Sequence, residues 1–428
     1  MGEKFDVIVV GAGLAGLACA YALAREEIPV LVVERGDYPG AKNVSGGRIY
    51  TLSLDQLLPG LWDDAPFERH VNRELLCFMN GEASVSVELF SSRFGTAPYH
   101  SHSVLRGTFD QWLASKVEES GGLIVTKMKV DELATVDGRV CGVRSAGDTV
   151  DADVVVLADG VNSLLARKLG LLGRPHPKHC AVAAKEIIEL PRGTIEDRFN
   201  LEGNEGAAML MVGFPSCGAK GGGFLYTNRE SLSLGLVVEI AAAMGADFQV
   251  SELTERLKSH PTIKRLVKGG RTVEYAAHLI PEAAVIPQTL VGDGVLVVGD
   301  AAGLCLNMGL TVRGMDYAIA SGALAARAIK EAREAGDLSR AKLSRFDRLL
   351  RGSFVGRDFG TFGKAQHLLD NQRLYRDYPD LACAALEQTM FFNGSPKERF
   401  SRAARREITS RVSVLKLLGD ALGGYRML

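Results

Sequence analysis

The sequence has no clustered cysteines. Its seven cysteines are scattered over 428 residues, and no two of them form a C-x-x-C pair. Zinc sites and iron–sulfur clusters need several cysteines held close together, so the local sequence predicts no metal site. An odd number of scattered cysteines indicates buried thiols in a reducing compartment. We therefore expect a cytoplasmic protein.

The chain also lacks an excess of charge of either sign. Its 50 basic and 51 acidic residues leave a formal net charge of -1, so the composition predicts no binding of nucleic acid. None of the eight histidines stands in a recognisable catalytic arrangement, and we name no general acid or base. The composition, with 46% hydrophobic residues, is that of an ordinary folded protein with the length of two or three domains.

One uncharged run, residues 7–24, has the length of a membrane span. Three glycines at regular spacing interrupt it, acidic Glu3 and Asp6 precede it, and a second apolar segment follows it. These features favour a nucleotide-binding fold over a membrane span or a signal peptide.

The start of the chain predicts a dinucleotide-binding unit. A buried strand (5–10) leads into GAGLAG, an Ala- and Leu-rich helix and a second strand (30–33). In this motif Gly11 permits the tight turn, Gly13 lets the backbone approach a pyrophosphate, and Gly16 removes a side chain where the helix crosses the sheet.

Two further features complete that unit. The helix N-terminus can hold phosphates, and an acid at the end of the second strand can accept hydrogen bonds from ribose hydroxyls. We expect the dinucleotide to contact Gly11, Gly13, Leu14, Ala15, Gly16 and Glu34. These residues alone leave the choice between FAD and NAD open.

Residues 35–50 predict a loop with exposed backbone, because glycines, a proline and small polar residues dominate it. Such a loop can lie against a flavin ring; the alternative is a plain surface turn. The expected contacts are Arg35, Ser45, Gly46, Gly47 and Arg48.

Two later strands also end in a turn that carries an acid. The strand 154–157 leads into Ala158, Asp159 and Gly160, where Asp159 is either a turn residue or a structural acid near the cofactor. The strand in 294–299 leads into Gly299 and Asp300, and Asp300 is placed to bind a ribityl hydroxyl.

Other cofactor contacts are expected around two helices. A long helix (315–332) follows a loop containing Gly309, Leu310 and Thr311, and its N-terminus can stabilise negative charge at the flavin N1–C2=O locus. Arg106 precedes a helix predicted to have Thr108 as its N-cap, and it is either a phosphate ligand or a surface residue. Val130, after the strand 123–126, completes the expected cofactor contacts.

The middle of the chain predicts an inserted antiparallel sheet. Its strands are 207–214, 221–228 and 231–240, joined by Gly-rich turns, and a helix over 251–268 is broken by Pro261. Residues 83–89 alternate as a half-buried strand does. The aromatic residues of the sheet either line a substrate or quinone cleft or belong to the core: Phe214, Phe224 and Tyr226.

The last 33 residues predict a basic helical region. Eight Lys or Arg stand against three acids, and Phe400, Ile408, Val412 and Leu415 recur at helical spacing as an apolar stripe. The region either meets a membrane surface or acidic partner, or docks on the body with a solvated face.

Taken together, the three nucleotide motifs resemble those of the p-hydroxybenzoate-hydroxylase-type flavoproteins. They are GAGLAG (11–16), VVVLADG (154–160) and VLVVGDAAG (295–303). Longer segments are similar to the FixC family, relatives of electron-transfer flavoprotein:quinone oxidoreductase, over nearly the whole chain: ERGDYPGAKNVSGGRIY (34–50), ELPRGTIEDRFNLEGNEGAA (189–208), GGGFLYTN (221–228), AHLIPEA (277–283) and GLTVRGMDYAIASG (309–322).

The resemblance implies an α/β protein with a Rossmann-like FAD-binding domain, an inserted antiparallel sheet for a quinone or substrate, and a C-terminal helical region facing a partner or membrane. FAD is its expected cofactor. The expected division is 1–75, 100–175 and 285–335 for the FAD-binding domain, 76–99 and 176–284 for the sheet, and 336–428 for the helices.

The resemblance also implies partners and a place in electron transfer. An electron-transfer flavoprotein alpha/beta pair would donate electrons in a Fix-type complex, as in nitrogen fixation, whether or not that complex bifurcates electrons. Mitochondrial-type relatives carry a cysteine-ligated [4Fe–4S] domain at the C-terminal end, and this chain has no such cysteines. Either a small ferredoxin-like subunit supplies the cluster or this chain does not reduce a quinone alone.

Two other functions share the nucleotide motifs. A flavin monooxygenase or geranylgeranyl-reductase-like enzyme would oxidise NAD(P)H, and a non-redox prenyl-binding escort protein would bind no flavin. A peripheral position on the inner face of the cell membrane is the alternative to a wholly cytoplasmic location.

Overall fold

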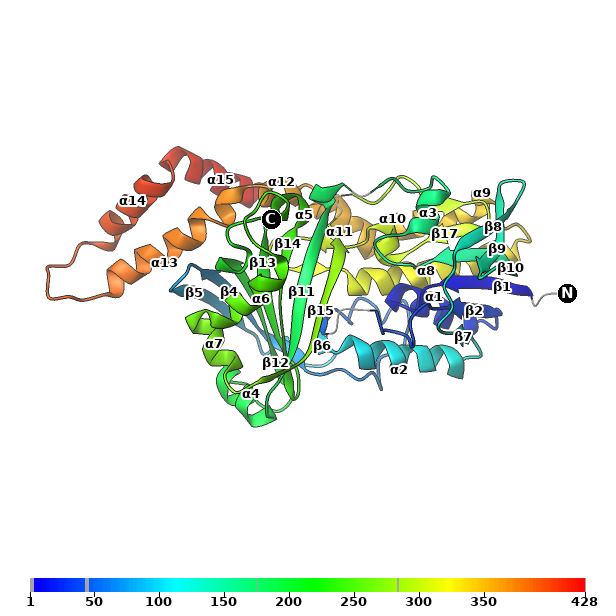
Figure 1. Ribbon diagram of the computed structural model, residues 1–428, viewed down its shortest axis with the longest axis horizontal. Helices are drawn as coiled ribbons and strands as arrows, with labels where there is room; N and C mark the ends of the chain where they lie inside the picture. Colours follow the sequence, from blue (N-terminus) through cyan, green and yellow to red (C-terminus); the bar gives the residue numbers. More distant parts are fainter. Residues whose placement is uncertain (1–3, 43–45, 175, 283–284, 428) are drawn as a thin grey trace.

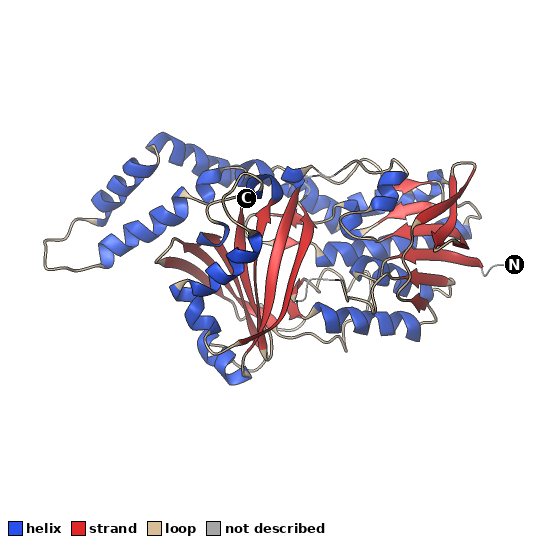
Figure 2. Ribbon diagram, in the orientation of Figure 1, coloured by secondary structure: helices blue, strands red, loops and turns tan. Residues whose placement is uncertain are grey.

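Two β-sheets follow one another along the long axis of the molecule, and helices pack against them (Figures 1 and 2). The computed structural model describes residues 4–42, 46–174, 176–282 and 285–427. The N-terminal sheet lies at one end of the long axis, and the last helices extend from the other end (Figure 1). This α/β architecture confirms the predicted fold class.

The first sheet is the predicted nucleotide-binding sheet. Its path is β16-β17-β10-β1-β2-β7, with β8 and β9 attached through β10. The pairs β1–β2, β1–β10 and β10–β17 are parallel, and their apolar residues are buried on both faces, as in other parallel sheets. The bounds are β1 (Lys4–Val10), β2 (Val30–Val33), β7 (Leu123–Val125), β8 (Glu132–Val136), β9 (Arg139–Ser145), β10 (Asp148–Leu157), β16 (Val291–Gly292) and β17 (Val295–Val297).

Helices pack closely on this sheet because small residues line their contacts. A Cβ added at Gly322 of α8 (Met315–Glu334) would overlap the backbone of Ala15 in α1 (Leu14–Ala24). Another helix of this domain, α2 (Arg106–Glu119), begins two residues before the predicted N-cap Thr108. Leu105 is its N-cap and no side chain caps it, so the prediction for Thr108 was wrong.

The second sheet is the predicted insertion. Its path is β15-β11-β14-β13-β12-β4-β6-β3, with β5 paired to β4, and it is antiparallel except between β12 and β4. The bounds are β3 (Gly47–Ile49), β4 (His70–Met79), β5 (Ser84–Phe90), β6 (His102–Val104), β11 (Cys180–Glu189), β12 (Glu205–Gly213), β13 (Gly221–Thr227), β14 (Ser231–Glu239) and β15 (Arg271–Pro281).

One face of the second sheet forms a separate apolar core. Leu225, Leu234 and Met211 are buried there beneath short helices. Pro261 begins the second of the two segments into which the predicted helix 251–268 divides. The helices near this sheet are α4 (Arg192–Phe199), α5 (Ile240–Ala243), α6 (Val250–Ser259), α7 (Pro261–Val267) and the 3-10 turns η1 (Pro177–His179) and η2 (Phe214–Ser216).

The remaining elements complete the first domain and the C-terminal arm. They are α3 (Leu164–Lys168), η3 (Gly299–Ala302), β18 (Leu306–Asn307), β19 (Val312–Arg313), α9 (Arg340–Leu343), α10 (Arg345–Gly352), α11 (Phe354–Phe362), α12 (Ala365–Leu369), η4 (Gln372–Leu374), α13 (Asp377–Met390), α14 (Phe400–Arg411) and α15 (Val414–Met427). None of the described helices is both long and apolar enough to cross a membrane.

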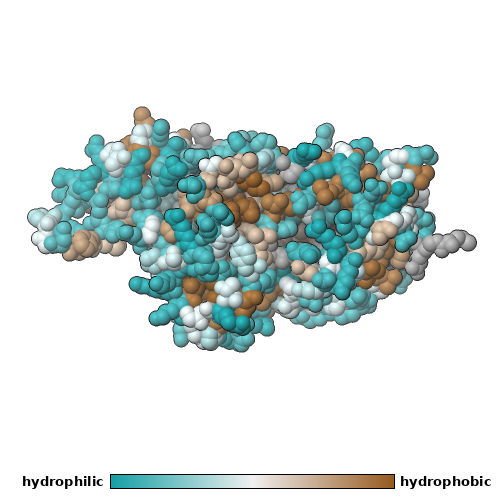
Figure 3. All heavy atoms as spheres, viewed as in Figure 1, coloured by the Kyte–Doolittle hydropathy of each residue, from teal (hydrophilic) through white to brown (hydrophobic). Residues whose placement is uncertain are grey.

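The C-terminal arm differs from the predicted stripe. The helix α14 ends at Arg411, Val412 is buried, and Leu415, 82% exposed, belongs to the next helix, so the stripe is not continuous. Figure 3 shows hydrophobic side chains at the tip and upper edge of this arm, among mostly hydrophilic ones. The exposed apolar residues of the arm are Met390, Phe391, Phe392, Phe400, Val414, Leu415, Leu418 and Leu422.

Two other predictions need adjustment. The strand β5 is an edge strand whose Val87 and Leu89 are exposed, so residues 83–89 are not half-buried. The predicted domain division stays a prediction, although residues 47–49, 70–75 and 102–104 pair with the second sheet and not with the first.

Candidate functional site

The three nucleotide motifs meet at one edge of the first sheet. Gly11, Ala158 and Val298 directly follow the neighbouring parallel strands β1, β10 and β17. The carboxyl ends of such strands form the ligand-binding edge of a doubly wound sheet. The structure therefore brings the predicted cofactor residues of all three motifs together.

The glycine motif has the expected steric roles. Gly11 has a φ of 106°, and a Cβ there would overlap the carbonyl of Ala158. A Cβ at Gly16 would overlap the Gly11 carbonyl, so Gly16 is needed for packing. A Cβ at Gly13, by contrast, would meet nothing within 4 Å among the described residues. Gly13 lies at the N-cap of α1, where space is left for a ligand.

Glu34 lies at the end of β2 beside this motif. Its Oε2 accepts a hydrogen bond from the Ala12 N–H (2.9 Å), and its Oε1 accepts one from the Gly36 N–H (2.6 Å). These bonds fix the carboxylate next to the glycine turn. An acid at the end of the second strand is the residue that binds ribose hydroxyls in dinucleotide-binding folds.

The second acid of the site, Asp159, is held by its own turn. Its Oδ1 accepts a hydrogen bond from the Ser163 hydroxyl (3.1 Å), and burial raises the pKa of the carboxyl. Gly160 follows with a φ of 79°. The arrangement agrees with a structural role for Asp159.

Asp300 is the second residue of η3 and lies near Arg106 and His278. Burial raises the pKa of its carboxyl, while Arg106 and His278 act in the opposite direction. His278 lies on β15, so the second sheet contributes a residue to the cofactor edge of the first. His278 lies in the family-like segment AHLIPEA (277–283), but no role was predicted for it, because the segment alone does not show which of its side chains faces the cofactor edge.

Arg106 is not the surface residue that one reading predicted, since its side chain is only 16% exposed. Its guanidinium binds both oxygens of the buried Asp110 at 2.8 Å. This pair lies next to Gly40, in the loop over residues 35–50 that is predicted to contact the flavin and that we call the flavin loop. Burial acts to lower the pKa of the Arg106 guanidinium, but Asp110 and the negative charge of Asp300 raise it. Asp110 was missed because its helical position four residues after Arg106 carries no motif.

The predicted flavin loop (35–50) lies against the second sheet, and its residues 47–49 form the strand β3 of that sheet, so the prediction of a loop was wrong for these three residues. A Cβ at Gly46 would overlap the Ser233 hydroxyl, and one at Gly47 would lie 2.9 Å from the Met315 sulfur. Arg48 makes a bidentate ion pair with Glu74 and also donates to Ser101, so its guanidinium is occupied within the second sheet. Ser45 lies outside the described residues.

The other predicted contacts lie around this edge. Gly309 has a φ of 90° and its N–H donates to the Asn307 side chain (3.0 Å), while Leu310 is 59% exposed. Arg35 is exposed, Thr311 is half-buried, and Val130 packs against the main core. Their contact with a cofactor stays a prediction.

The second sheet turns a polar and aromatic face toward the flavin loop. The cross-strand register places Lys185, Gly235 and Phe224 side by side on this face. Ile187, Ser233 and Tyr226 form the next row. The rings of Phe224 and Tyr226 stack with centroids 5.3 Å apart. We call this surface the site face.

Phe214 does not belong to the site face. It packs against the apolar core on the opposite face, where its ring lies 4.9 Å from that of His260 and below the Arg256 guanidinium. The chain leaves β12 at Gly213, where a φ of 102° turns η2 across the sheet. Of the two alternatives left open for Phe214, the structure therefore supports the core and not the cleft.

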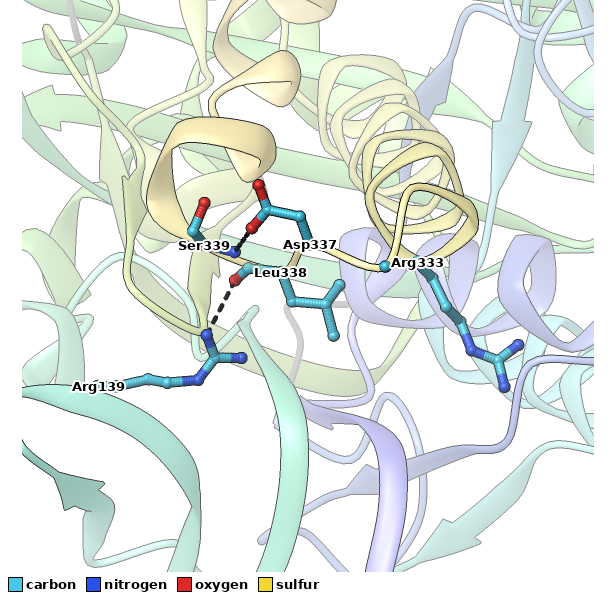
Figure 4. A pocket seen from close by; sticks show the side chains of 6 residues that line it. Arg139, Arg333, Asp337, Leu338 and Ser339 are labelled. Carbon is cyan, nitrogen blue, oxygen red and sulfur yellow. Dashed lines mark hydrogen bonds between the residues drawn. The ribbon is translucent and has the colours of Figure 1, made fainter.

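A hollow of about 500 Å³ lies elsewhere and is not the cofactor site. Figure 4 shows it between Arg139 and Arg333, where Arg139 donates to the Leu338 carbonyl (3.3 Å) and Ser339 to Asp337 (2.9 Å). A second hollow beside it is lined by Asp6 and Asp153. These residues lie away from the carboxyl strand ends, on the side where β1 begins.

The residues at the cofactor edge fit FAD. The open space above Gly13 suits a pyrophosphate, Glu34 is fixed at the ribose position, and half-buried Asp300 offers an acceptor at the next strand end. The second sheet also contributes to this edge, because Gly46 of the flavin loop lies against Ser233 of the site face. Among the described residues, no group of three or more His, Cys, Asp or Glu could hold a metal ion.

The fold and site define an FAD-dependent oxidoreductase. Residues 6–86 match the family model for FAD dependent oxidoreductases. Residues 182–280 match the model described as ETF-QO, ubiquinone-binding, and residues 365–428 match the ETF-QO/FixC family C-terminal domain. The ubiquinone-binding match includes most of β11 and all of β13 and β14, the strands that form most of the site face.

Full-length relatives identify the family. The chain is 44% identical to Protein FixC of Escherichia coli (strain K12), with 100% of this chain and 99% of that protein covered. It is 42% identical to the probable electron transfer flavoprotein-quinone oxidoreductase YdiS of the same organism, with 99% and 98% covered. Protein FixC of Azorhizobium caulinodans is 40% identical, with 98% of each chain covered. The chain belongs to the FixC family.

Solved structures support the fold at lower identity. A geranylgeranyl bacteriochlorophyll reductase-like protein from Thermoplasma acidophilum superimposes with a TM-score of 0.73 at 21% identity, covering 98% of this chain and 99% of that one. The myxobacterial FAD-dependent halogenase CndH gives a TM-score of 0.66 at 20% identity, covering 96% and 91%. These similarities show a shared fold.

Proposed function

We propose that this protein accepts electrons from an electron-transfer flavoprotein onto FAD and passes them toward a quinone bound at the site face. One observation carries the proposal: the region that matches a ubiquinone-binding family places Phe224 and Tyr226 on the face that packs against the flavin loop. Aromatic rings suit a flat apolar ligand such as a quinone. FAD, when bound, supplies the redox chemistry.

The residues at the strand ends bind and position the cofactor in this proposal. The α1 N-terminus and Gly13 receive the pyrophosphate, Glu34 binds ribose hydroxyls, and Asp300 accepts a hydrogen bond from the ribityl chain. The α8 N-terminus directs its backbone N–H groups toward the flavin end of the site. The other proposed contacts are Gly11, Leu14, Ala15, Gly16, Arg35, Gly46, Gly47, Arg48, Arg106, Val130, Ala158, Asp159, Gly160, Gly299, Gly309, Leu310 and Thr311.

The proposed partners follow from the family and from the exposed apolar residues of the C-terminal arm. The relatives' names support an electron-transfer flavoprotein and a quinone as partners. We also propose a small ferredoxin-like subunit carrying a [4Fe–4S] cluster, because no metal-binding group stands among the described residues. The C-terminal arm, with exposed Phe391, Phe392 and Leu415 beside basic residues, is the surface proposed for this subunit or for a peripheral membrane contact.

A test of the function uses the full chain loaded with FAD. Reduced electron-transfer flavoprotein should be oxidised in the presence of a soluble ubiquinone analogue, and adding the cluster-bearing partner should raise the rate. Fast oxidation of NAD(P)H with oxygen uptake, stimulated by an organic substrate, would instead indicate a monooxygenase or prenyl reductase. A purified chain without flavin absorbance, made with FAD available, would contradict the proposal and favour a prenyl-binding escort protein.

A further inference from the structure

Lys185 is a buried amine at the junction between the two sheets. The residue is 8% exposed, and its side chain extends from β11 on the site face. Its Nζ donates a hydrogen bond to the Gly46 carbonyl in the flavin loop. The amine also lies 5.7 Å from the centre of the Phe224 ring. Lys185 thus contacts both the loop expected at the flavin and the aromatic row expected at the quinone.

Lys185 differs from other shielded lysines because no carboxylate of the described residues forms an ion pair with it. Lys220 lies 2.9 Å from Glu239, and Lys258 lies 2.9 Å from Glu186. A buried charge without a paired partner is costly, and proteins rarely keep one without a use. The absence of an acid beside Lys185 leaves room for negative charge that comes with a ligand.

The charged neighbours of Lys185 come from three elements. Arg106 of α2 lowers the pKa of the amine and Glu274 of β15 raises it, but burial has the largest effect and brings the pKa down to about 7. Arg106 is itself paired with Asp110. The other titratable groups on the site face near the loop include Tyr226 on β13, His278 on β15 and Glu74 on β4, which forms an ion pair with Arg48.

The flavin loop is fixed where Lys185 holds it. Gly46 has a φ of 74°, and any side chain there would overlap Ser233, so the turn lies tightly against β14. A Cβ at Gly235, directly across from Lys185, would overlap the Phe224 ring, which shows that the ring fills the space beside the amine. The amine therefore cannot move far from the loop without repacking the face.

We propose that Lys185 takes up a proton when electrons reach FAD bound beside the flavin loop, so that the positive charge of the amine balances the negative charge that arrives. The inference rests on the proposed function. Two electrons come from the reduced electron-transfer flavoprotein; one proton comes from water and forms an N–H bond at Nζ, beyond any that the cofactor takes. When the electrons leave, that N–H bond breaks and the proton returns to water.

The direction of the pH dependence follows from the position of the amine. Below about pH 7 Lys185 is protonated before the electrons arrive, so no proton is linked to reduction. Above about pH 7 the amine is neutral in the oxidised protein, and negative charge beside it favours the ammonium form. Reduction by two electrons then takes up one additional proton, so the reduction potential should fall more steeply as the pH rises. The additional slope corresponds to a tenfold change in the equilibrium constant per pH unit.

The experiment measures the midpoint potential of the full FAD-loaded chain by spectroelectrochemistry at about pH 6 and about pH 8.5. We compare the wild type with Lys185→Met, Lys185→Arg and the control Lys258→Met, whose amine pairs with Glu186 on the opposite face of β11. Lys185→Met should have a lower potential than the wild type at pH 6, with a smaller gap at pH 8.5. Lys185→Arg should match the wild type at pH 6 and exceed it at pH 8.5, because its guanidinium stays charged.

The outcomes separate this inference from the function on which it rests. Equal potentials for the wild type and Lys185→Met at both pH values would overturn the role of Lys185, even if quinone reduction is observed. Failure of the wild type to pass electrons to a quinone would overturn the proposed function and leave the potentials to be judged separately. If Lys185→Met does not fold, Lys185→Arg still tests the inference, since a potential equal to that of the wild type at pH 8.5 would contradict it.

Discussion

The two sheets use their residues in opposite ways. In the first sheet the strands β1, β10 and β17 are apolar along their buried lengths, and the chemistry lies in the turns that follow them. In the second sheet only one face is apolar, and the other carries Lys185, Phe224 and Tyr226 along the strands themselves. The first sheet thus presents a cofactor at its edge, and the second presents a surface to that cofactor.

The largest effect should come from the glycine turn of the first sheet. We expect Gly13→Val to abolish FAD binding, because the side chain would fill the space needed by the pyrophosphate, while the stability of the apoprotein stays unchanged. Flavin absorbance after dialysis and thermal melting of the apoprotein measure the two effects.

Gly16→Val provides the matched control for the same turn. Its side chain would overlap the Gly11 carbonyl, so this variant should lose stability by roughly 1–3 kcal/mol or more and lose flavin only as a consequence. Normal flavin content in Gly13→Val would show that the turn does not receive the pyrophosphate.

Asp300→Ala tests the deeper acid at the same edge. A charged acceptor for a ribityl hydroxyl contributes roughly 1.5–3 kcal/mol, so the Kd for FAD should rise by about tenfold or more. Titration of the apoprotein with FAD measures this change. The exposed Asp148→Ala, in the strand β10 but away from the edge, should leave the Kd unchanged. Equal affinities for Asp300→Ala and the wild type would remove Asp300 from the site.

The first sheet could be predicted from the sequence because local patterns determine it. Gly11, Gly13 and Gly16 have fixed spacing, Glu34 ends a strand, and Asp300 follows another apolar run. Each motif is read from fewer than about ten neighbouring residues, and the rules of parallel sheets bring the motifs together.

The site face could not be predicted in the same way. The sequence does not reveal which face of β11 or β13 meets the flavin loop, because that depends on cross-strand register over long separations. Lys185 and His278 were assigned no role for this reason. The choice between cleft and core stayed open for Phe214, because the turn at Gly213 that takes it to the core face is not visible in the sequence. Thr108 is not the N-cap because the helix already begins at Arg106, with Leu105 as its N-cap.

A third prediction concerns a buried histidine of the second sheet. His102 of β6 is buried and stacks on Phe67, and burial lowers the pKa of its imidazole to about 4. Since the unfolded state binds a proton near pH 6.5 and the folded state resists it, stability is full above pH 6.5 and falls as the pH approaches 4. Between pH 6.5 and 5 the loss should reach about 2 kcal/mol, at 1.36 kcal/mol per pH unit.

Urea unfolding at several pH values measures that loss. His102→Gln, which has no titrating group, should show a flatter dependence on pH than the wild type, although His70 and His100 also have lowered pKa values and leave some slope. An unchanged slope in the variant would mean that His102 is not the titrating group.

The smallest effect separates the two faces of the second sheet. Phe224 lies on the site face beside Lys185, and Phe214 packs on the opposite face against α6. If the faces have different tasks, Phe224→Ala should raise the KM for a quinone about fivefold, corresponding to about 1 kcal/mol of lost aromatic contact. Phe214→Ala should lower the free energy of unfolding by roughly 1–2 kcal/mol, because its ring is only partly buried, and leave the KM unchanged. Steady-state kinetics with a soluble ubiquinone analogue and urea unfolding of both variants supply the two readings. Equal KM changes in the two variants would mean that the quinone does not distinguish the faces, and the assignment of the site face would then be wrong.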